Sequence, residues 1–169
     1  MEEESWTPPP PHSVQIDVDG AVRHQHQAAC GGVIRNAQGE WLMEFCKSLG
    51  QHSVIEAEIQ AIMLGLKMGH QMGLQKVLIY SDSLNAISIL MRDCPMDHPL
   101  RNIIGETRDL LFNDWNVELH HTSRDNISCA DYMAKEGHNV AVEDGVVMTP
   151  TIPQGCLHLA LRDQGSIHG

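Results

Sequence analysis

The stretch Val14-Gln15-Ile16-Asp17-Val18-Asp19-Gly20 is the part of this chain that decides its fold. Its first, third and fifth residues are apolar and alternate with polar ones, which is the pattern of a strand with one buried face. Asp19 closes the run, and Gly20 follows it directly. The stretch therefore predicts a core strand that carries a bare carboxylate at its end.

A second acid, Glu58, lies inside the clearest predicted helix, which runs from Val54 to Gln71. Apolar residues recur there at three- and four-residue spacing, and Glu58 falls on that face whereas Glu56 points away from it. A boundary glutamate would pair with a basic residue, but no Lys or Arg precedes Lys67 in this helix. We therefore expect Glu58 to face the sheet, and a more distant basic partner stays open.

Two more acids stand in comparable positions. Asp82 follows the near-continuous apolar run 74–80, which is typical of a strand covered on both faces. Ser81 or Asp82 alternatively serves as the N-cap of the next helix. Asp131 lies in a stretch of small residues and shares a face of the helix 127–135 with its apolar members, so it is expected to point inward.

Acids that converge from several elements repel one another, and their burial is costly unless a positive group neutralises them. Hard divalent cations such as magnesium do so through oxygen ligands. A cluster of this kind that holds two metals carries out phosphoryl transfer. We therefore interpret Asp19, Glu58, Asp82 and Asp131 as one metal-binding group.

The order of elements predicts an α/β fold. Strand, turn and strand follow one another from residue 28 to 46, with Asn36 and Gly39 in the turn, so the first three strands form an antiparallel meander. The last two strands follow crossover helices and should run parallel to the first. The result is a mixed five-stranded sheet flanked by helices, with strands at 14–19, 28–35, 40–46, 74–80 and 116–121 and helices at 54–71, 84–92, 100–112 and 127–135.

The length of 169 residues suits one domain, for which we expect the bounds 13–139. We expect residues 1–12 to form a proline-rich leader, which is either a spacer or an interaction motif. Residues 140–169 are expected to form a weakly periodic tail, in which 156–161 is a short helix or a docking strip. The net charge of −11 argues against tight unaided binding of nucleic acid, although bound metal offsets part of it.

The five cysteines show no CxxC spacing and read as free thiols in a reducing compartment. The N-terminus has no apolar signal region, and no apolar run approaches membrane-spanning length. We therefore expect an intracellular protein that is neither secreted nor membrane-bound, with nucleus or cytoplasm left open.

Several short segments, in order over residues 14–139, resemble those of ribonuclease H and, more closely, of the plant ribonuclease H-like domains related to retroelement reverse transcriptases. The matching segments are Asp17-Val18-Asp19-Gly20-Ala21; Cys30-Gly31-Gly32-Val33-Ile34-Arg35-Asn36 with Gly39 and Trp41; Ala57-Glu58 with Ala61 and Gly65-Leu66; Tyr80-Ser81-Asp82-Ser83-Leu84; and His121 with Arg124, Ala130-Asp131 and Ala134. Each is weak alone, and their order and spacing make the set specific.

The resemblance implies a two-metal endonuclease that cuts the RNA strand of RNA–DNA hybrids and leaves 5′-phosphate and 3′-hydroxyl ends. Asp19, Glu58, Asp82 and Asp131 would hold two Mg²⁺ ions, with Mn²⁺ as a substitute, and Asp19 would bridge them. His121 would assist proton movement or product release, or else be an ordinary histidine at a strand end.

Five further residues are candidates for contact with the substrate. Gly31, Gly32 and Arg35 are candidates to approach the RNA strand, since glycine permits close backbone contact, although Gly31-Gly32 alternatively marks a strand bulge. Asn85 is a candidate phosphate donor, and Arg124 completes the substrate-binding set. We expect a monomer that binds a hybrid or another nucleic acid, with the leader or tail available to a protein partner.

Two departures from the family pattern leave an alternative open. Ile127 stands where the plant group usually has Asn, and Asn126 would have to take over by a one-residue shift. The basic protrusion with which some bacterial members grip the hybrid is not evident. The alternative is a catalytically inactive, retroelement-derived domain that binds nucleic acid or protein. A 3′–5′ exonuclease is disfavoured because its first two acids usually lie close together, and a metal-free structural protein would leave four inward acids to coincidence.

Overall fold

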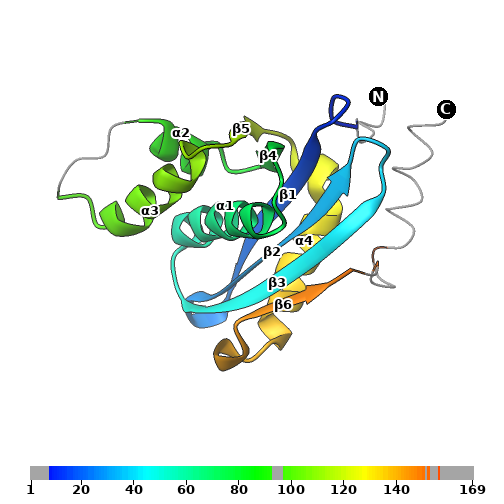
Figure 1. Cartoon of the computed structure of the whole chain (residues 1–169). Helices are drawn as coiled ribbons and strands as arrows, with labels where there is room; N and C mark the ends of the chain where they lie inside the picture. Colours follow the sequence, from blue (N-terminus) through cyan, green and yellow to red (C-terminus); the bar gives the residue numbers. More distant parts are fainter. Residues whose placement is uncertain (1–7, 93–96, 151, 153–155, 157–169) are drawn as a thin grey trace, which may run out of the picture.

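The computed structural model describes residues 8–92, 97–150, 152 and 156. One six-stranded sheet has the order β5-β4-β1-β2-β3-β6 (Figure 1). Its strands are β1 Val14–Arg23, β2 Gln27–Asn36, β3 Trp41–Gln51, β4 Lys76–Ser81, β5 Asn116–His121 and β6 Val146–Thr149. The helices are α1 Val54–Gln71, α2 Leu84–Met91, α3 Arg101–Leu111 and α4 Ser128–Glu136, and the short 3₁₀ turns are η1 His24–His26, η2 Arg124–Ile127, η3 Gly137–Asn139 and η4 Val142–Asp144.

The predicted strand directions are confirmed. β1 pairs antiparallel with β2, and β2 pairs antiparallel with β3. β4 pairs parallel with β1, and β5 pairs parallel with β4. The predicted turn also forms: Asn36 Oδ1 accepts hydrogen bonds from the backbone N–H groups of Gln38 and Glu40, and Gly39 takes a φ of 77°.

The predicted strand count of five is wrong, because β6 adds a sixth strand. β6 lies in the segment predicted as a tail, and it pairs antiparallel with β3 from Glu44↔Thr149 to Lys47↔Val146. Its four residues are too few for an alternating pattern to stand out in the sequence. Backbone hydrogen bonds to the long partner strand β3 hold these four residues in an extended conformation. Of the stretch 156–161, only Cys156 lies within the described residues.

Helices cover both faces of the sheet. α1 packs on β1, β2 and β4 on one face, and α2 and α3 lie beside α1 (Figure 1). α4 packs on β1, β2 and β3 on the other face. The main core fills the α1 side around Ile16, Val18, Ile62 and Ile79, while a smaller cluster of Val33, Cys46, Cys129, Met133 and Cys156 fills the α4 side.

The small cluster also explains most of the cysteines. Within the described residues, Cys30, Cys46, Cys129 and Cys156 are buried and free, which confirms the reading as unpaired thiols; Cys94 lies outside those residues. No helix in the described part of the chain is long and apolar enough to cross a membrane.

Gly31 sets how closely α4 approaches the sheet. A Cβ built on Gly31 would lie 2.5 Å from the backbone carbonyl carbon of Met133, so any side chain there would push α4 away from β2. Gly105, on the exposed side of α3, offers a contrast, since nothing lies within 4 Å of its added Cβ.

Replacing each of these glycines with alanine should therefore change stability in opposite directions. Gly31→Ala should lower the free energy of unfolding by about 1–3 kcal/mol through overpacking. Gly105→Ala should raise it by about 0.5–1 kcal/mol, because alanine favours the helix. Urea unfolding followed by circular dichroism measures both, and equal stability of the two variants would contradict the close approach of α4.

Candidate active site

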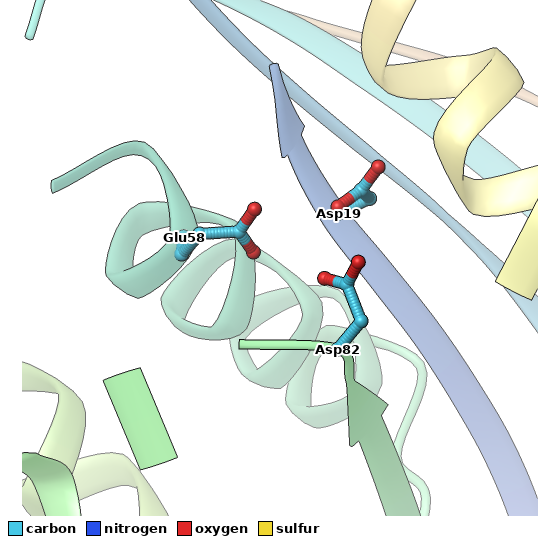
Figure 2. A group of neighbouring side chains, drawn as sticks. All are labelled: Asp19, Glu58 and Asp82. Carbon is cyan, nitrogen blue, oxygen red and sulfur yellow. The ribbon is translucent and has the colours of Figure 1, made fainter. Parts of the chain in front are cut away.

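Three carboxylates from separate elements converge at one edge of the sheet. Asp19 comes from β1, Glu58 from the first turns of α1, and Asp82 from the residue after β4 (Figure 2). One oxygen of each lies within 4.8 Å of an oxygen of both others. Within the described residues this is the one group of three or more acidic, histidine or cysteine side chains arranged closely enough to hold a metal ion.

Local structure fixes each of the three acids. Ser53 caps the start of α1 by accepting a hydrogen bond from the Glu56 N–H. Glu58 falls on the buried side of this helix, whereas the Glu56 side chain faces outward and pairs with His52 at 2.6 Å. Asp82 is not the cap of α2, because Ser83 accepts the hydrogen bond from the Ala86 N–H at 3.2 Å. The N-cap alternative for Ser81 or Asp82 is therefore wrong, and the Asp82 carboxylate faces the other acids.

Burial and repulsion from neighbouring acids make Asp19 and Glu58 hard to ionise. Asp19 is fully buried, and burial, followed by the charges of Glu58 and Asp82, raises its pKa to about 9. Burial and the charge of Asp82 raise the pKa of Glu58 to about 7, against the Gly20 backbone N–H, which hydrogen-bonds Glu58. The folded chain therefore holds protons at this site that free carboxyl groups would release near pH 4.

The donor set fits a hard divalent cation. Both Asp19 oxygens and Glu58 Oε2 are buried and accept no hydrogen bond from an N–H or O–H group of the described residues when the acids are ionised. Converging carboxylate oxygens without donors are the ligands that Mg²⁺ and Ca²⁺ prefer. A bound cation would satisfy these oxygens and cancel the repulsion among the acids.

Asp131 borders the same site from α4. When Asp19 is protonated, a side-chain hydrogen bond joins it to Asp131, and both this bond and the charge of Asp131 raise the pKa of Asp19. On its other side, an Asp131 oxygen lies 2.9 Å from Lys135 Nζ, one helical turn further on. Asp131 is thus at the site, as expected, but is more exposed than Asp19 and already has a cationic partner.

The loop before α4 brings a cation to the site. Arg124 Nε lies 3.3 Å from Asp82 Oδ2, and the Arg124 side chain remains 67% exposed. The side-chain amide of Asn126 donates to Thr122 Oγ1 at 3.1 Å and ties this loop together. Ile127 is buried beneath it. Asn126 therefore supplies a side-chain amide one residue before the position at which the family usually has one.

His121 and Asn85 lie at the rim. His121 ends β5 opposite Ser81, the residue before Asp82, and its side chain is exposed. Neighbouring His120 is half-buried and stacks on Tyr80, with 5.2 Å between ring centroids. Asn85 is exposed in the first turn of α2. Both His121 and Asn85 are therefore free to meet a large ligand.

The residues expected to approach RNA from β2 do not lie on the surface. Gly31 and Gly32 are buried; an added Cβ on Gly31 would meet α4, and one on Gly32 would lie 2.4 Å from the Phe45 ring. Neither is a bulge, since the register shifts of β2 fall at Ala28/Ala29 and Ile34/Arg35. Close packing explains both glycines.

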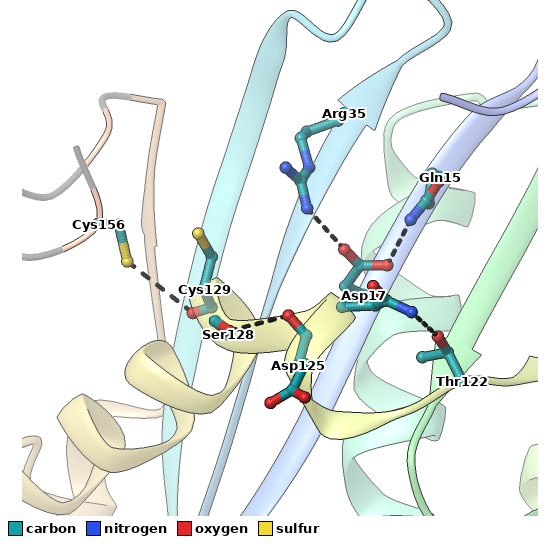
Figure 3. Close-up of polar contacts among 9 residues, drawn as sticks. Gln15, Asp17, Arg35, Thr122, Asp125, Ser128, Cys129 and Cys156 are labelled. Carbon is teal, nitrogen blue, oxygen red and sulfur yellow. Dashed lines mark hydrogen bonds and ion pairs between the residues drawn. The ribbon is translucent and has the colours of Figure 1, made fainter. Parts of the chain in front are cut away.

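Arg35 is likewise buried, at 2% exposure, and its guanidinium forms an ion pair with Asp17 at 2.8 Å (Figure 3). Gln15 donates to the other Asp17 oxygen at 2.8 Å. Sequence reasoning missed this polar cluster behind the site. The available signal was the spacing of Asp17 and Asp19, since residues two apart on a strand share a face.

The model of the reverse transcriptase-like family matches residues 17–137, so the chain belongs to that family. Its fold is ribonuclease H-like. RNase H1 of the halophilic archaeon Halobacterium salinarum superposes with a TM-score of 0.70 and 25% identity, over 76% of this chain and 99% of that protein. LC11-RNase H1, solved in complex with an RNA/DNA hybrid, gives a TM-score of 0.67 and 20% identity, over 75% and 96% of the two chains.

An Arabidopsis thaliana protein named "Putative ribonuclease H protein" is 27% identical over 138 residues. The match covers 81% of this chain but 22% of that relative, so the chain corresponds to about a fifth of it. These likenesses place the chain among ribonuclease H-type proteins.

The raised pKa values predict how stability depends on pH. The folded state keeps protons on Asp19 up to about pH 9 and on Glu58 up to about pH 7, while unfolded carboxyl groups lose theirs near pH 4. In EDTA, the melting temperature should therefore fall as pH rises from about 5 to about 9. Asp19→Asn should flatten this slope and raise the melting temperature at pH 8 by about 2–4 °C for each 1 kcal/mol of relieved repulsion.

Thermal melts in EDTA and in Mg²⁺ test this expectation. Mg²⁺ should raise the melting temperature of the wild type at pH 8 and leave Asp19→Asn almost unchanged. Asp109→Asn, on the exposed face of α3, is the matched control and should follow the wild type. An equal response of Asp19→Asn and the wild type would contradict the metal site.

Proposed function

We propose that this chain is a magnesium-dependent endonuclease that hydrolyses the RNA strand of RNA–DNA hybrids. The observation that carries the proposal is the cluster of Asp19, Glu58 and Asp82, in which both Asp19 oxygens and Glu58 Oε2 are buried and accept no hydrogen bond from the described residues. Burial and the neighbouring acids raise the pKa values of Asp19 and Glu58. The ribonuclease H-like fold supports it, as does a structural neighbour solved with an RNA/DNA hybrid.

Two Mg²⁺ ions would be held by Asp19, Glu58, Asp82 and Asp131, with Asp19 shared between them, and Mn²⁺ would serve in their place. Bound metal of this kind activates water for attack and stabilises the departing oxyanion of a phosphodiester. Asp19 is the central ligand because its oxygens are the most deeply buried of the four. Asp131 would contact the ion in place of part of its ion pair with Lys135, and its partial exposure permits this change.

The chain's other residues would position the substrate. Arg124 lies next to Asp82 with most of its side chain exposed, and its guanidinium can bind a phosphate oxygen. His121, exposed at the end of β5, is placed to carry a proton to or from the leaving group near neutral pH. Asn85 would donate its amide to a neighbouring phosphate. Such contacts read the backbone and not the base sequence.

The alternative is an inactive domain that binds nucleic acid or a protein partner. The net charge of −11 favours it, because an acidic surface repels a phosphate backbone. The cluster favours the enzyme, because a pure binding domain gains nothing from two buried acids and a partly exposed third that repel one another. We propose that the enzyme acts as a monomer and binds its hybrid weakly, with strong dependence on salt.

Cleavage of a labelled RNA–DNA hybrid at low salt tests the proposal. The wild type should cut the RNA strand with Mg²⁺ and not with EDTA, and Asp82→Asn should lose about a hundredfold or more of the rate. Asp109→Asn removes an acid of the same kind from an exposed helix face and should cleave normally. A folded wild type that is silent with Mg²⁺ and with Mn²⁺ would leave the inactive domain as the better account.

Replacing His121 should slow the reaction without weakening metal binding. We expect His121→Ala to lower the maximal rate roughly a hundredfold, the size of effect that a positioned proton-transfer group contributes. Its Mg²⁺-dependent rise in melting temperature should match that of the wild type. His24→Ala, in the β1–β2 hairpin, is the control. An unchanged rate for His121→Ala would make this residue an ordinary histidine at a strand end.

A further inference from the structure

A hollow of about 350 Å³ lies between β3, β6 and the C-terminal half of α4. Two residues of β3, Glu44 and Cys46, point into it, together with their cross-strand partners Thr149 and Val147 on β6. From the opposite side, α4 contributes Tyr132, Met133 and Glu136. The proposed metal ligands do not line this hollow.

Glu44 stands out among the lining residues because its carboxylate is buried without a cation. Glu44 is 2% exposed, and among the described residues its one hydrogen-bond donor is the indole N–H of Trp41, 3.1 Å from Oε2. No Lys, Arg or His of the described part of the chain pairs with it. Burial raises the pKa of Glu44 to about 7, only partly opposed by the bond from Trp41.

The nearby cations are engaged elsewhere. Arg35, which lies over the Trp41 ring, forms its ion pair with Asp17, and Lys135 forms its pair with Asp131. A second acid, Glu136, reinforces the negative charge instead of cancelling it. Glu136 and, to a lesser extent, Glu44 raise the pKa of the Tyr132 phenol, so this ring lies within the field of both carboxylates.

We propose that the hollow binds an organic cation, an ammonium or guanidinium group on an apolar stem. The cation would pair with Glu44 at the base, where a buried acid gains most from a partner. Glu136 and the Tyr132 ring would flank the charge from α4, since an aromatic face attracts a cation. Met133, Val140 and Val147 provide apolar surface for the stem.

This ligand chemistry separates the hollow from a metal site. A hard divalent ion needs several converging oxygens, and in the described residues only Asp19, Glu58 and Asp82 provide such a group. The hollow offers one deeply buried carboxylate, a second acid from α4 and apolar walls. That set fits a single organic cation on an apolar stem, either a free amine or an Arg or Lys side chain presented by a polypeptide.

Calorimetric titration of the full chain at pH 8 tests the proposal with four probes: arginine amide, its neutral analogue citrulline amide, spermidine, and the peptide Gly-Arg-Gly-Gly amide. The wild type should bind the cationic probes saturably and ignore citrulline amide. Glu44→Gln keeps the acceptor for Trp41 and should weaken cation binding at least tenfold, and Glu136→Gln should weaken it less. Glu40→Gln, exposed next to β3, is the matched control and should bind like the wild type.

The two sources of the cation give different results. Tighter binding of the arginine peptide than of arginine amide and spermidine would identify a side chain held by a polypeptide, and the reverse order would identify a free amine. Equal binding by Glu44→Gln and the wild type, or no saturable binding of any cationic probe by a folded wild type, would overturn the proposal. Hybrid cleavage by Glu44→Gln should stay unchanged, so this test and that of the nuclease proposal fail separately.

Discussion

The repulsion among Asp19, Glu58 and Asp82 is the constraint on which the rest of the structure depends. Three carboxylates within 4.8 Å of one another do not stay together without a force that holds their elements in place. Packing supplies that force. An added Cβ on Gly20 would lie 2.7 Å from the backbone of Ala57, next to Glu58, so the strand and the helix touch where their acids meet. The core therefore sustains a repulsive site that a cation would relieve.

A second buried acid of β1, Asp17, is neutralised within the chain. Asp17 lies two residues before Asp19 and is as deeply buried, yet it has Arg35 and Gln15 as partners. An acid that serves the architecture is satisfied within the chain, whereas both Asp19 oxygens and Glu58 Oε2 have no donor among the described residues. Glu44 belongs with the second kind, since the one donor that it has among the described residues is an indole N–H. In the described part of the chain, a structural acid such as Asp17 thus has a cationic partner, whereas Asp19, Glu58 and Glu44 form no ion pair.

Sequence patterns predicted the elements with the strongest periodicity. The helix 54–71 and the strand 116–121 have the bounds expected of them, because a long apolar stripe or a run flanked by turn residues leaves few alternatives. The patterns failed where tertiary contacts decide. Gly31, Gly32 and Arg35 were expected to approach the RNA strand. In the structure, Arg35 pairs with a buried acid, and the two glycines make room for a helix and an aromatic ring. β6 is too short to show a period.

By itself, the sequence determined which residues are acids on apolar faces, because alternation and helical spacing record the direction of each side chain relative to its own element. It therefore selected Asp19, Glu58, Asp82 and Asp131 and the order of strands and helices. Only the tertiary structure decided which of them meet: three form the close group, and Asp131 borders it while paired with Lys135. Distance, burial and the absence of a donor arise between elements, and no local pattern encodes them.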